Sequence, residues 1–389
     1  MSTRRHPAPW QVAVFAAIPA IWIGSATVLA TSGRSWSVTD FLTFRAAASN
    51  LLQGRSPYPR VDPSVLAAGH SFVYPPIAAY PFIPFAALPA HVAIIVYLIA
   101  SLVAIALALS IVGVRDWRVL GVVMLWEPVL MWLLEGPIEP WMLLLLAIAW
   151  HWRAHTVRLA AIVALLIALK LFMWPLLVWL LATRRIRAFL ASAAITTVFV
   201  LVPFASVGIE VLRAYPHLLQ TLTNVFGPTS FSILGVLDSV ASSRVAELAT
   251  VGAALALIGL IAFLASREDG DRRALSAAVV GAVMVSPIVW GHYYVLLALP
   301  IALARPRLSL LWFAPLVFWG TGAAALGEPH RLAIGMLIPL VVLVGTCRRR
   351  KSDYGDEDRA RERPALGALG AALAQSTGSG SGSASPAMR

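Results

Sequence analysis

The feature that most constrains this chain is a series of long apolar stretches, which recurs from about residue 10 to about residue 347. Short clusters of Arg, His, Gly and Pro separate the stretches, and several are long enough to cross a hydrocarbon core of roughly 30 Å. Hydrophobic residues make up 59% of the 389 residues and charged residues only 12%, whereas soluble domains carry about a quarter charged residues. A soluble fold could not bury this much apolar surface, so we expect an all-α integral membrane protein.

About twelve transmembrane helices are predicted from hydropathy and from the positions of the basic clusters. The predicted spans are 10–31, 88–113, 119–134, 139–152, 159–169, 172–183, 188–207, 245–265, 274–289, 293–304, 308–324 and 331–347. The first span lacks a small-residue cleavage site of the A-x-A type, so we interpret it as a retained helix and not as a removed signal peptide.

The basic clusters predict the sidedness of the spans, because cytoplasmic loops carry an excess of Lys and Arg. This excess explains the net charge of +12 better than nucleic-acid binding does, and we expect no nucleic-acid partner. Both termini are therefore predicted to be cytoplasmic, in a multi-pass protein of the cytoplasmic (plasma) membrane. The clusters lie at 4–5, 115–118, 152–158, 184–187, 267–273, 305–307 and 348–351.

This topology divides the chain into a cytoplasmic N-terminus (1–9), a polytopic transmembrane domain (10–347) and a cytoplasmic tail (348–389). The tail ends in a stretch rich in Gly and Ser, a composition typical of flexible linkers, so we predict that it is disordered. Two long segments, 32–87 and 208–244, are predicted on the extracytoplasmic side, where other connections are tight turns.

An amphipathic helix is predicted over residues 39–53, lying in the membrane interface after the first span. Thr39 is the predicted N-cap and Gly54 the predicted helix stop. The predicted apolar face comprises Phe41, Phe44, Ala48, Leu51 and Leu52.

The stretch 159–183 lies between two basic clusters, although it is only a little longer than one span needs. Flanks on the same side require an even number of crossings, so we expect two short helices that turn near Lys170. Helices that stop inside a membrane are tolerated where they line a cavity or pack inside protein. The pattern therefore predicts a buried cavity near Lys170.

Ionisable residues at membrane depth or on the extracytoplasmic side are candidates for chemistry. Asp40 ranks first, since a carboxylate at the start of the interfacial helix can take a proton from an attacking sugar hydroxyl. The alternative is that Asp40 only stabilises the first turn through the helix dipole. Tyr58 and Tyr74 lie in a Pro-rich loop and offer rings on which a sugar can stack, or they form an aromatic belt at the interface.

The first extracytoplasmic segment resembles that of glycosyltransferase family 87. The resemblance rests on Asp40-Phe41, Arg45-Ala46-Ala47, Leu51-Leu52, Gly54, Pro57-Tyr58, Phe72-Val73-Tyr74-Pro75-Pro76, Pro84 and Leu88-Pro89. Members of that family are multi-span enzymes of GT-C architecture that use polyprenyl-phosphate sugars, among them an α-1,2-mannosyltransferase that extends phosphatidylinositol mannosides. The resemblance implies that Asp40 is the general base.

A later stretch, Ser286-Pro287-Ile288-Val289-Trp290-Gly291-His292-Tyr293-Tyr294, is similar to a second pattern of the family. By this resemblance His292 contacts the donor phosphate or orients the acceptor, and Trp290 and Tyr293 contact substrate. The alternative for His292 is a purely structural hydrogen bond. Lys170 resembles the family's Lys-x-x-x-Pro segment and would neutralise the lipid phosphate, with Arg45 as a further candidate; otherwise Lys170 snorkels at a helix end.

The chain also departs from the family pattern. Many members carry Gly-Gln-x-Asn after the third span, where this chain has Glu135-Gly136-Pro137-Ile138-Glu139-Pro140. Two amides are thus replaced by two carboxylates, and we list Glu135 and Glu139 as substrate-binding candidates. This departure bears on the acceptor and on the sugar more than on the base.

We therefore expect a glycosyltransferase that moves mannose from polyprenyl-phosphate mannose to a lipid-anchored glycan such as a phosphatidylinositol mannoside, with inversion to an α-linkage. The expected partners are the lipid-linked donor, a glycolipid acceptor and membrane lipids. No Asp-x-Asp pair for a metal-bound nucleotide sugar lies on the extracytoplasmic side, so neither metal nor other cofactor is expected. The alternatives are another lipid-linked sugar such as arabinofuranose, a transporter or lipid flippase, and a structural subunit of an envelope-building complex.

Overall fold

The computed structural model describes residues 7–32, 38–58, 61–67, 69, 71–238, 240–321 and 328–347, and these form helices and connecting turns without a strand. The predicted tail 348–389 and the basic clusters at both ends of the chain lie outside the described residues. The α-helices are α1 (Pro9–Val12), α2 (Ile18–Ala30), α3 (Thr39–Leu52), α4 (Pro63–Ala67), α5 (Ile83–Ala86), α6 (Ala90–Ile111), α7 (Trp117–Met124), α8 (Glu127–Glu135), α9 (Glu139–His151), α10 (Thr156–Leu169), α11 (Pro175–Ala182), α12 (Ile186–Val207), α13 (Ile209–Phe226), α14 (Ile233–Asp238), α15 (Ser243–Ala265), α16 (Gly270–Val285), α17 (Ala298–Ala304) and α18 (Pro329–Cys347).

Other helical segments have different periods. These are the π-helix η1 (Ala13–Ala17), which joins α1 to α2, and the 3-10 helices η2 (Pro76–Phe82), η3 (Leu171–Met173), η4 (Gly227–Thr229), η5 (Gly291–Leu297) and η6 (Leu310–Gly320).

In the part of the chain that the structure describes, five helices are long and apolar enough to span a membrane. They are Pro9–Ala30, Ala90–Ile111, Ile186–Val207, Ser243–Ala265 and Pro329–Cys347. A sixth is obtained if the bent pair α7 and α8 is counted as one span. The other predicted spans fall on shorter helices, such as α10 and α11, so an apolar all-helical protein is confirmed while twelve crossings stay a prediction.

The bend between α7 and α8 measures 64° and has a local cause. Pro128 stands in the first turn of α8 and has no amide hydrogen. Its ring would also clash with the carbonyl of Met124 if the helix continued. The amides of Leu125 and Trp126 instead bond three residues back, to Val122 and Val123, which tightens the turn. The predicted straight span 119–134 is therefore two helices.

The break at Lys170 is confirmed. Helix α10 ends at Leu169, Lys170 itself has an extended backbone (φ −145°, ψ 109°), and the chain resumes as η3 and α11. Pro175 opens α11, where a missing amide hydrogen costs nothing because the first turn has no acceptor for it. Two short helices thus meet at a buried turn.

The predicted helix after the first span is α3, but its start differs from the prediction. Val38, not Thr39, is the N-cap, with a left-handed backbone (φ 51°) and no side-chain cap. Its amide donates instead to the carbonyl of Leu134 at 2.5 Å, so a tertiary bond to α8 decides where α3 begins. Gly54 (φ 67°) ends the helix as predicted. Leu52 was expected on the apolar face and is 60% exposed.

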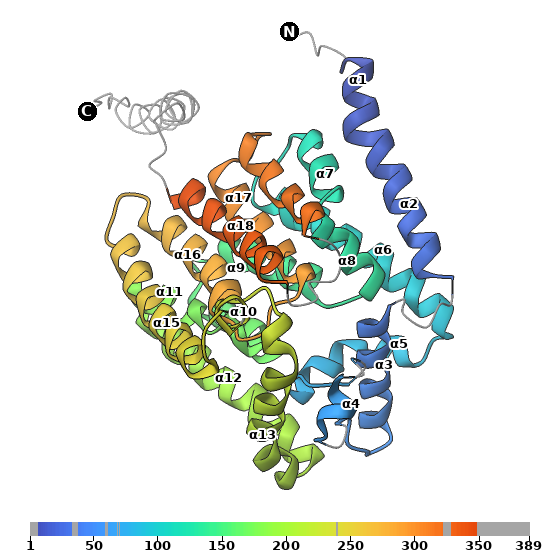
Figure 1. Cartoon of the computed structure of the whole chain (residues 1–389), viewed down its shortest axis with the longest axis vertical. Helices are drawn as coiled ribbons and strands as arrows, with labels where there is room; N and C mark the ends of the chain where they lie inside the picture. The colour runs from blue at the N-terminus through green and yellow to red at the C-terminus, as the bar shows by residue number, and fades with distance from the viewer. Residues whose placement is uncertain are drawn as a thin grey trace, which may run out of the picture. The chain divides into compact units, whose positions relative to one another are not determined.

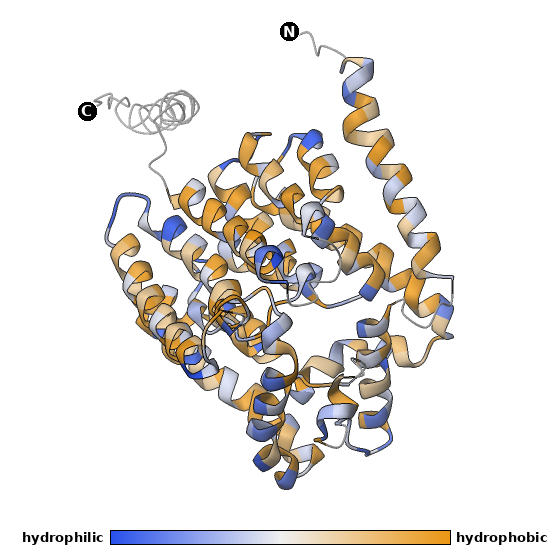
Figure 2. Cartoon of the chain, in the orientation of Figure 1, coloured by the Kyte–Doolittle hydropathy of each residue, from blue (hydrophilic) through white to orange (hydrophobic). Residues whose placement is uncertain are grey.

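The second segment predicted to be extracytoplasmic contains the amphipathic helix α13, which packs against the first segment. Leu66 of α4, Phe204 of α12, and Tyr215 and Leu218 of α13 form one small buried cluster, and the Tyr215 hydroxyl donates to the carbonyl of Val73 at 3.1 Å. Figure 2 shows hydrophilic bands along α13, whereas α2 is mostly hydrophobic. The two segments predicted to lie outside the membrane therefore form one layer around α3, α4 and α13.

Gly136 fixes the approach of α3 to α8, and we predict that Gly136→Ala destabilises the protein. Its φ is +72°, and a Cβ would lie 2.8 Å from the Cβ of Phe41. A non-glycine residue in a sparsely populated backbone conformation costs about 1–3 kcal/mol, and the clash adds to this. The unfolding midpoint of the purified protein in detergent, followed by tryptophan fluorescence, should therefore fall.

Gly259→Ala is the matched control, since Gly259 lies inside α15 with open space around its Cα. Alanine favours a helix over glycine by about 1 kcal/mol, so this variant should be neutral or slightly stabilised. Equal midpoints for the two variants would contradict the proposed role of Gly136.

Candidate functional site

A cavity of about 460 Å³ lies where the layer around α3, α4 and α13 meets the ends of α8, α10 and α16. Helix α3 and the loop before η2 contribute one wall, α13 contributes a second, and η3, η5 and the end of α16 complete it. The cavity is lined by seven of the ten predicted site residues: Asp40, Tyr74, Glu135, Lys170, Trp290, His292 and Tyr293. Segments far apart in sequence thus bring most of the candidates together.

Lys170 and Glu139 form a buried ion pair behind the cavity surface. Lys170 is 2% exposed and Glu139 is fully buried, and the ammonium donates a hydrogen bond to Glu139 Oε1. The same ammonium lies 4.1 Å from the ring centre of Tyr293 and 4.9 Å from that of Tyr74. This burial excludes a snorkelling lysine. Because each charge would be costly without the other, the pair holds α9 and the α10 break together.

His292 lies between two carboxylates. Its Nδ1 is 2.7 Å from Glu135 Oε2, and its Nε2 is 3.7 Å from Glu139 Oε1. The Nε2 atom is buried without a hydrogen-bond partner among the described residues, as is Glu139 Oε2. Since His292 lines the cavity, it is a polar group still able to bond a ligand there.

The turn between α8 and α9 sends its two glutamates to different places. Glu135 ends α8 and lines the cavity, whereas Glu139 opens α9 and lies behind it. The turn is held by the carbonyl of Pro137, which accepts hydrogen bonds from the Tyr97 hydroxyl at 2.7 Å and from Trp132 Nε1 at 3.1 Å. Glu135 is therefore placed to meet a ligand, and Glu139 to support Lys170 and His292.

Asp40 lies in the first turn of α3, half-buried at the cavity wall. The pKa of its carboxyl is raised to about 6, mainly by burial. The nearby His292 acts to lower this pKa, and the charge of Glu135 acts to raise it. A carboxylate with a pKa near 6 is a stronger base than an ordinary aspartate and is still ionised at neutral pH. This suits a general base, although a stabilising effect on the first turn of α3 is compatible with the same position.

Two candidates do not line the cavity but support residues that do. The Arg45 guanidinium donates to the carbonyls of Phe85 at 3.1 Å and Leu88 at 2.8 Å, and so ties α3 to the end of α5. The Tyr58 hydroxyl donates to the carbonyl of Tyr74 at 2.7 Å. Arg45 thus holds α3, the helix that carries Asp40, and Tyr58 holds the loop that carries Tyr74.

The apolar side of the cavity was missed in the sequence. It is formed mainly by Leu171, Phe172, Leu219, Leu222, Phe226 and Ile288. The positions from α13 recur at helical spacing, so the periodicity of residues 209–226 could have identified this wall. The cavity is thus lined by charged and hydroxyl groups and by aliphatic and aromatic groups, a mixed lining that suits a ligand with a polar head and an apolar chain.

Glu127 received no predicted role, yet it is 5% exposed and its Oε2 has no partner among the described residues. It stands close to η5, since a Cβ on Gly291 would lie 3.6 Å from Glu127 Oε2.

In the part of the chain that the structure describes, no group of three or more His, Cys, Asp and Glu residues is arranged to hold a metal ion.

One comparison with known proteins gives a match. The model of glycosyltransferase family 87 matches residues 72–287, which is more than half of the chain. The matched region includes α8, α9, the break at Lys170 and α13, and it ends at Pro287 beside the second family-like stretch. No curated protein and no solved structure matches the chain.

The Lys170–Glu139 pair predicts a specific pattern of stabilities. Lys170→Met leaves Glu139 buried without its counter-charge, which should lower the free energy of unfolding by about 3–5 kcal/mol. The double variant Lys170→Met, Glu139→Gln removes both charges and should recover most of this loss. Thermal unfolding in detergent measures both effects. A single variant as stable as the unchanged protein would show that the pair does not hold this region together.

Proposed function

Because the chain belongs to glycosyltransferase family 87, we propose that it transfers mannose from polyprenyl-phosphate mannose to a lipid-anchored glycan such as a phosphatidylinositol mannoside. The observation that carries this proposal is a cavity lined both by the polar groups of Asp40, Lys170 and His292 and by aliphatic and aromatic side chains. The polar groups suit a sugar phosphate, and the apolar side chains suit a prenyl chain. The reaction takes place on the extracytoplasmic face, to which we assign α3 and α13.

In the proposed reaction Asp40 is the general base. The acceptor hydroxyl gives its proton to the Asp40 carboxylate as its oxygen bonds to the anomeric carbon. The bond between that carbon and the phosphate oxygen breaks on the opposite side, and its electron pair stays with the polyprenyl phosphate. Attack from the side opposite the leaving group inverts a β-linked donor and gives an α-glycoside.

The departing phosphate gains negative charge, so cationic and hydrogen-bonding groups near it lower the barrier. We assign this role to Lys170 and to the unpartnered Nε2 of His292. Glu139 and Glu135 hold these two groups in place, since each contacts one or both of them. Neither a nucleotide nor a metal takes part in this scheme, because the phosphate is already activated as a leaving group in the donor.

The sugar itself would lie against rings. Tyr74, Trp290 and Tyr293 line the cavity from two different segments. The ring face of Trp290 suits the C–H surface of a hexose. The faces of Tyr74 and Tyr293 are covered by the Lys170 ammonium and by Phe44 and Phe172, so these two would contact the sugar through their edges and hydroxyls. Trp290 is held by an edge contact with Phe226 of α13, and Tyr293 stacks on Phe172. Glu135 would accept hydrogen bonds from sugar hydroxyls, which makes it the residue through which the donor sugar or the acceptor is selected.

The experiment is a transfer assay with the purified protein in lipid nanodiscs, radiolabelled polyprenyl-phosphate mannose and a phosphatidylinositol mannoside acceptor. Asp40→Asn should lower the rate of product formation by about 10²–10⁴-fold, the usual contribution of a general base. Asp62→Asn is the matched control, since Asp62 is exposed in the same segment and bonds only Ser64 among the described side chains.

Product from the unchanged chain and from Asp62→Asn, but not from Asp40→Asn, supports both the reaction and the base. Equal product from all three removes Asp40 from the mechanism. If no protein gives product, the same assay with polyprenyl-phosphate arabinofuranose tests a different sugar. Movement of the donor lipid across the bilayer without bond formation would favour a transporter.

The raised pKa of Asp40 predicts a pH profile. The base must be ionised to accept a proton, so the rate at low substrate should be half-maximal near pH 6 and constant above about pH 7. Below pH 6 it should fall about tenfold for each pH unit. Initial rates measured across this range test the prediction, with Asp62→Asn expected to give the same profile. A rate that does not change between pH 5 and pH 7 would contradict it.

A further inference from the structure

A second cavity of about 460 Å³ lies at the other end of α10, one of the helices that meet at the first cavity. It is built from the turn before α10, the turn between α11 and α12, and the first turns of α10 and α12. Helix α10 leads from this cavity at Thr156 to the break at Lys170, a length of about 21 Å for its 14 residues. The catalytic proposal uses none of the residues that line the second cavity.

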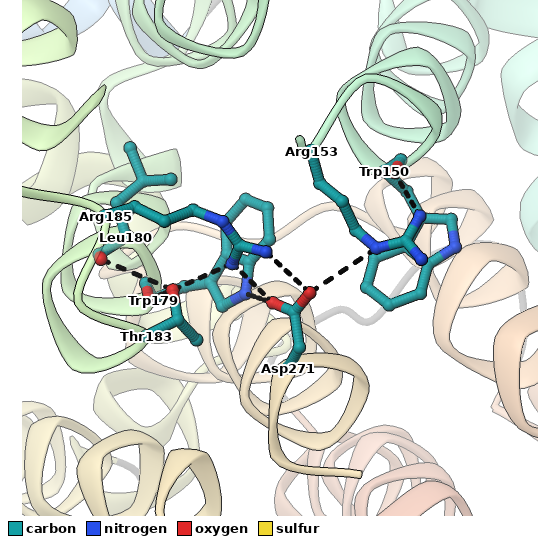
Figure 3. A network of polar contacts seen from close by, with 7 residues as sticks. All are labelled: Trp150, Arg153, Trp179, Leu180, Thr183, Arg185 and Asp271. Carbon is teal, nitrogen blue, oxygen red and sulfur yellow. Dashed lines mark hydrogen bonds and ion pairs between the residues drawn. The ribbon is translucent and has the colours of Figure 1, made fainter. Parts of the chain in front are cut away.

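Arginine dominates this second cavity. Four arginines line it: Arg153, Arg184, Arg185 and Arg187. Figure 3 shows Asp271, at the start of α16, between Arg153 and Arg185. Its carboxylate accepts two hydrogen bonds from the Arg185 guanidinium, at 2.6 and 2.8 Å, and lies 3.5 Å from Arg153 Nε. One carboxylate therefore orients two arginines but balances only one positive charge.

The surrounding tryptophans and hydroxyls hold this arrangement in place. Trp179 Nε1 donates to the same carboxylate at 2.9 Å, and Arg185 also donates to Thr183 Oγ1 at 2.9 Å. The Arg153 guanidinium stacks 4.1 Å above the ring of Trp150 and donates to the Trp150 carbonyl. Two cations are thus pre-oriented at the cavity before any ligand binds, which lowers the cost of binding.

Arg184 and Arg187 complete the cavity and are free to bind. Both side chains are exposed, and neither makes an ion pair or a side-chain hydrogen bond in the described part of the chain. The first-turn amides of α10 and α12, which have no partner within their helices, begin at the same cavity. With Arg153 and Arg185, these groups leave a net positive cavity that fits a phosphate.

The neighbouring surface indicates a lipid as the source of the phosphate. Helix α12 is apolar and long enough to span a membrane, and it begins at this cavity. Ile186, Leu190 and Leu201 along it are 47%, 59% and 46% exposed. A phosphate held by the arginines would therefore continue into acyl chains that cover an exposed apolar surface, whereas a soluble anion would leave that surface uncovered.

We propose that this cavity binds the phosphate headgroup of an anionic phospholipid, in the leaflet opposite the catalytic cavity. Bound there, the lipid would bridge the turn before α10 and the turn before α12, through Arg153 on one side and Arg184 and Arg187 on the other. The first cavity lies at the other end of α10, at Lys170, and at the end of α16, at Val285. The site is distinct from any donor or acceptor site and does not depend on the proposed reaction.

The test measures binding to the full chain purified in detergent, by native mass spectrometry, with dioleoyl phosphatidylglycerol and dioleoyl phosphatidylcholine as probes. The unchanged chain should prefer phosphatidylglycerol. Arg184→Gln, Arg187→Gln should lower its affinity by about tenfold or more, because two charge-assisted hydrogen bonds are lost. Neither side chain makes an ion pair or a hydrogen bond in the described fold, so folding should be unaffected. An unchanged unfolding midpoint verifies this.

Arg115→Gln, Arg267→Gln is the matched control. This variant also removes two positive charges, from exposed arginines that lie in other turns and do not line the cavity. It should keep the affinity for phosphatidylglycerol. Equal losses in both double variants, or no preference over phosphatidylcholine, would overturn the proposal. Displacement of phosphatidylglycerol by inorganic phosphate at equal concentration would also overturn it, by assigning the cavity to a soluble anion.

Discussion

The buried ion pair between Lys170 and Glu139 is the interaction on which the site depends. Two opposite charges placed in an apolar bundle are tolerable only together. Lys170 can reach Glu139 because α10 stops at Leu169 and the backbone becomes extended for one residue. The chain then returns as α11. A helix break, a buried charge pair and a cavity wall are therefore formed by the same residues.

The pair also organises its neighbours. Glu139 lies within 3.7 Å of His292, and the Lys170 ammonium lies against the rings of Tyr74 and Tyr293. Residues from the loop before η2, from α9 and from η5 thus meet around one ammonium group. Asp40 approaches the same cavity from α3, whose start is held to α8 by the bond from Val38 to Leu134. The polar wall is rigid because each of its members is held from a different element.

Helices α10 and α16 each have one end near the catalytic cavity and the other near the arginine-lined cavity. Lys170 and Ser286 line the first cavity, while Thr156 lines the second and Asp271 orients its arginines. These helices, about 21 Å long for α10 and about 24 Å for α16, are a direct physical connection between the two cavities. A membrane enzyme built in this way can hold its substrates on one side and be anchored by lipid on the other.

Much of this could be read from the sequence. The long apolar stretches predict a membrane protein, because a soluble fold could not bury so much apolar surface. An even number of crossings between two basic clusters required a break near Lys170. The motifs around Asp40 and His292 pointed to a glycosyltransferase of family 87, and the family match agrees. What the sequence determined were the properties that depend on local composition and on residue patterns: helical structure, the main breaks and the chemical class.

Other features were decided only by the tertiary structure. Arg45 donates hydrogen bonds to backbone carbonyls about forty residues away, such as that of Phe85. Glu139 lies behind the cavity because it pairs with Lys170. Helix α13 forms a cavity wall because α4 and α12 bury its apolar side chains against them. Four arginines line one cavity, and Asp271 orients two of them, although it lies 86 residues after Arg185 and 118 after Arg153. Hydropathy and spacing report what a residue prefers, but which partner it meets depends on contacts between segments far apart in the chain.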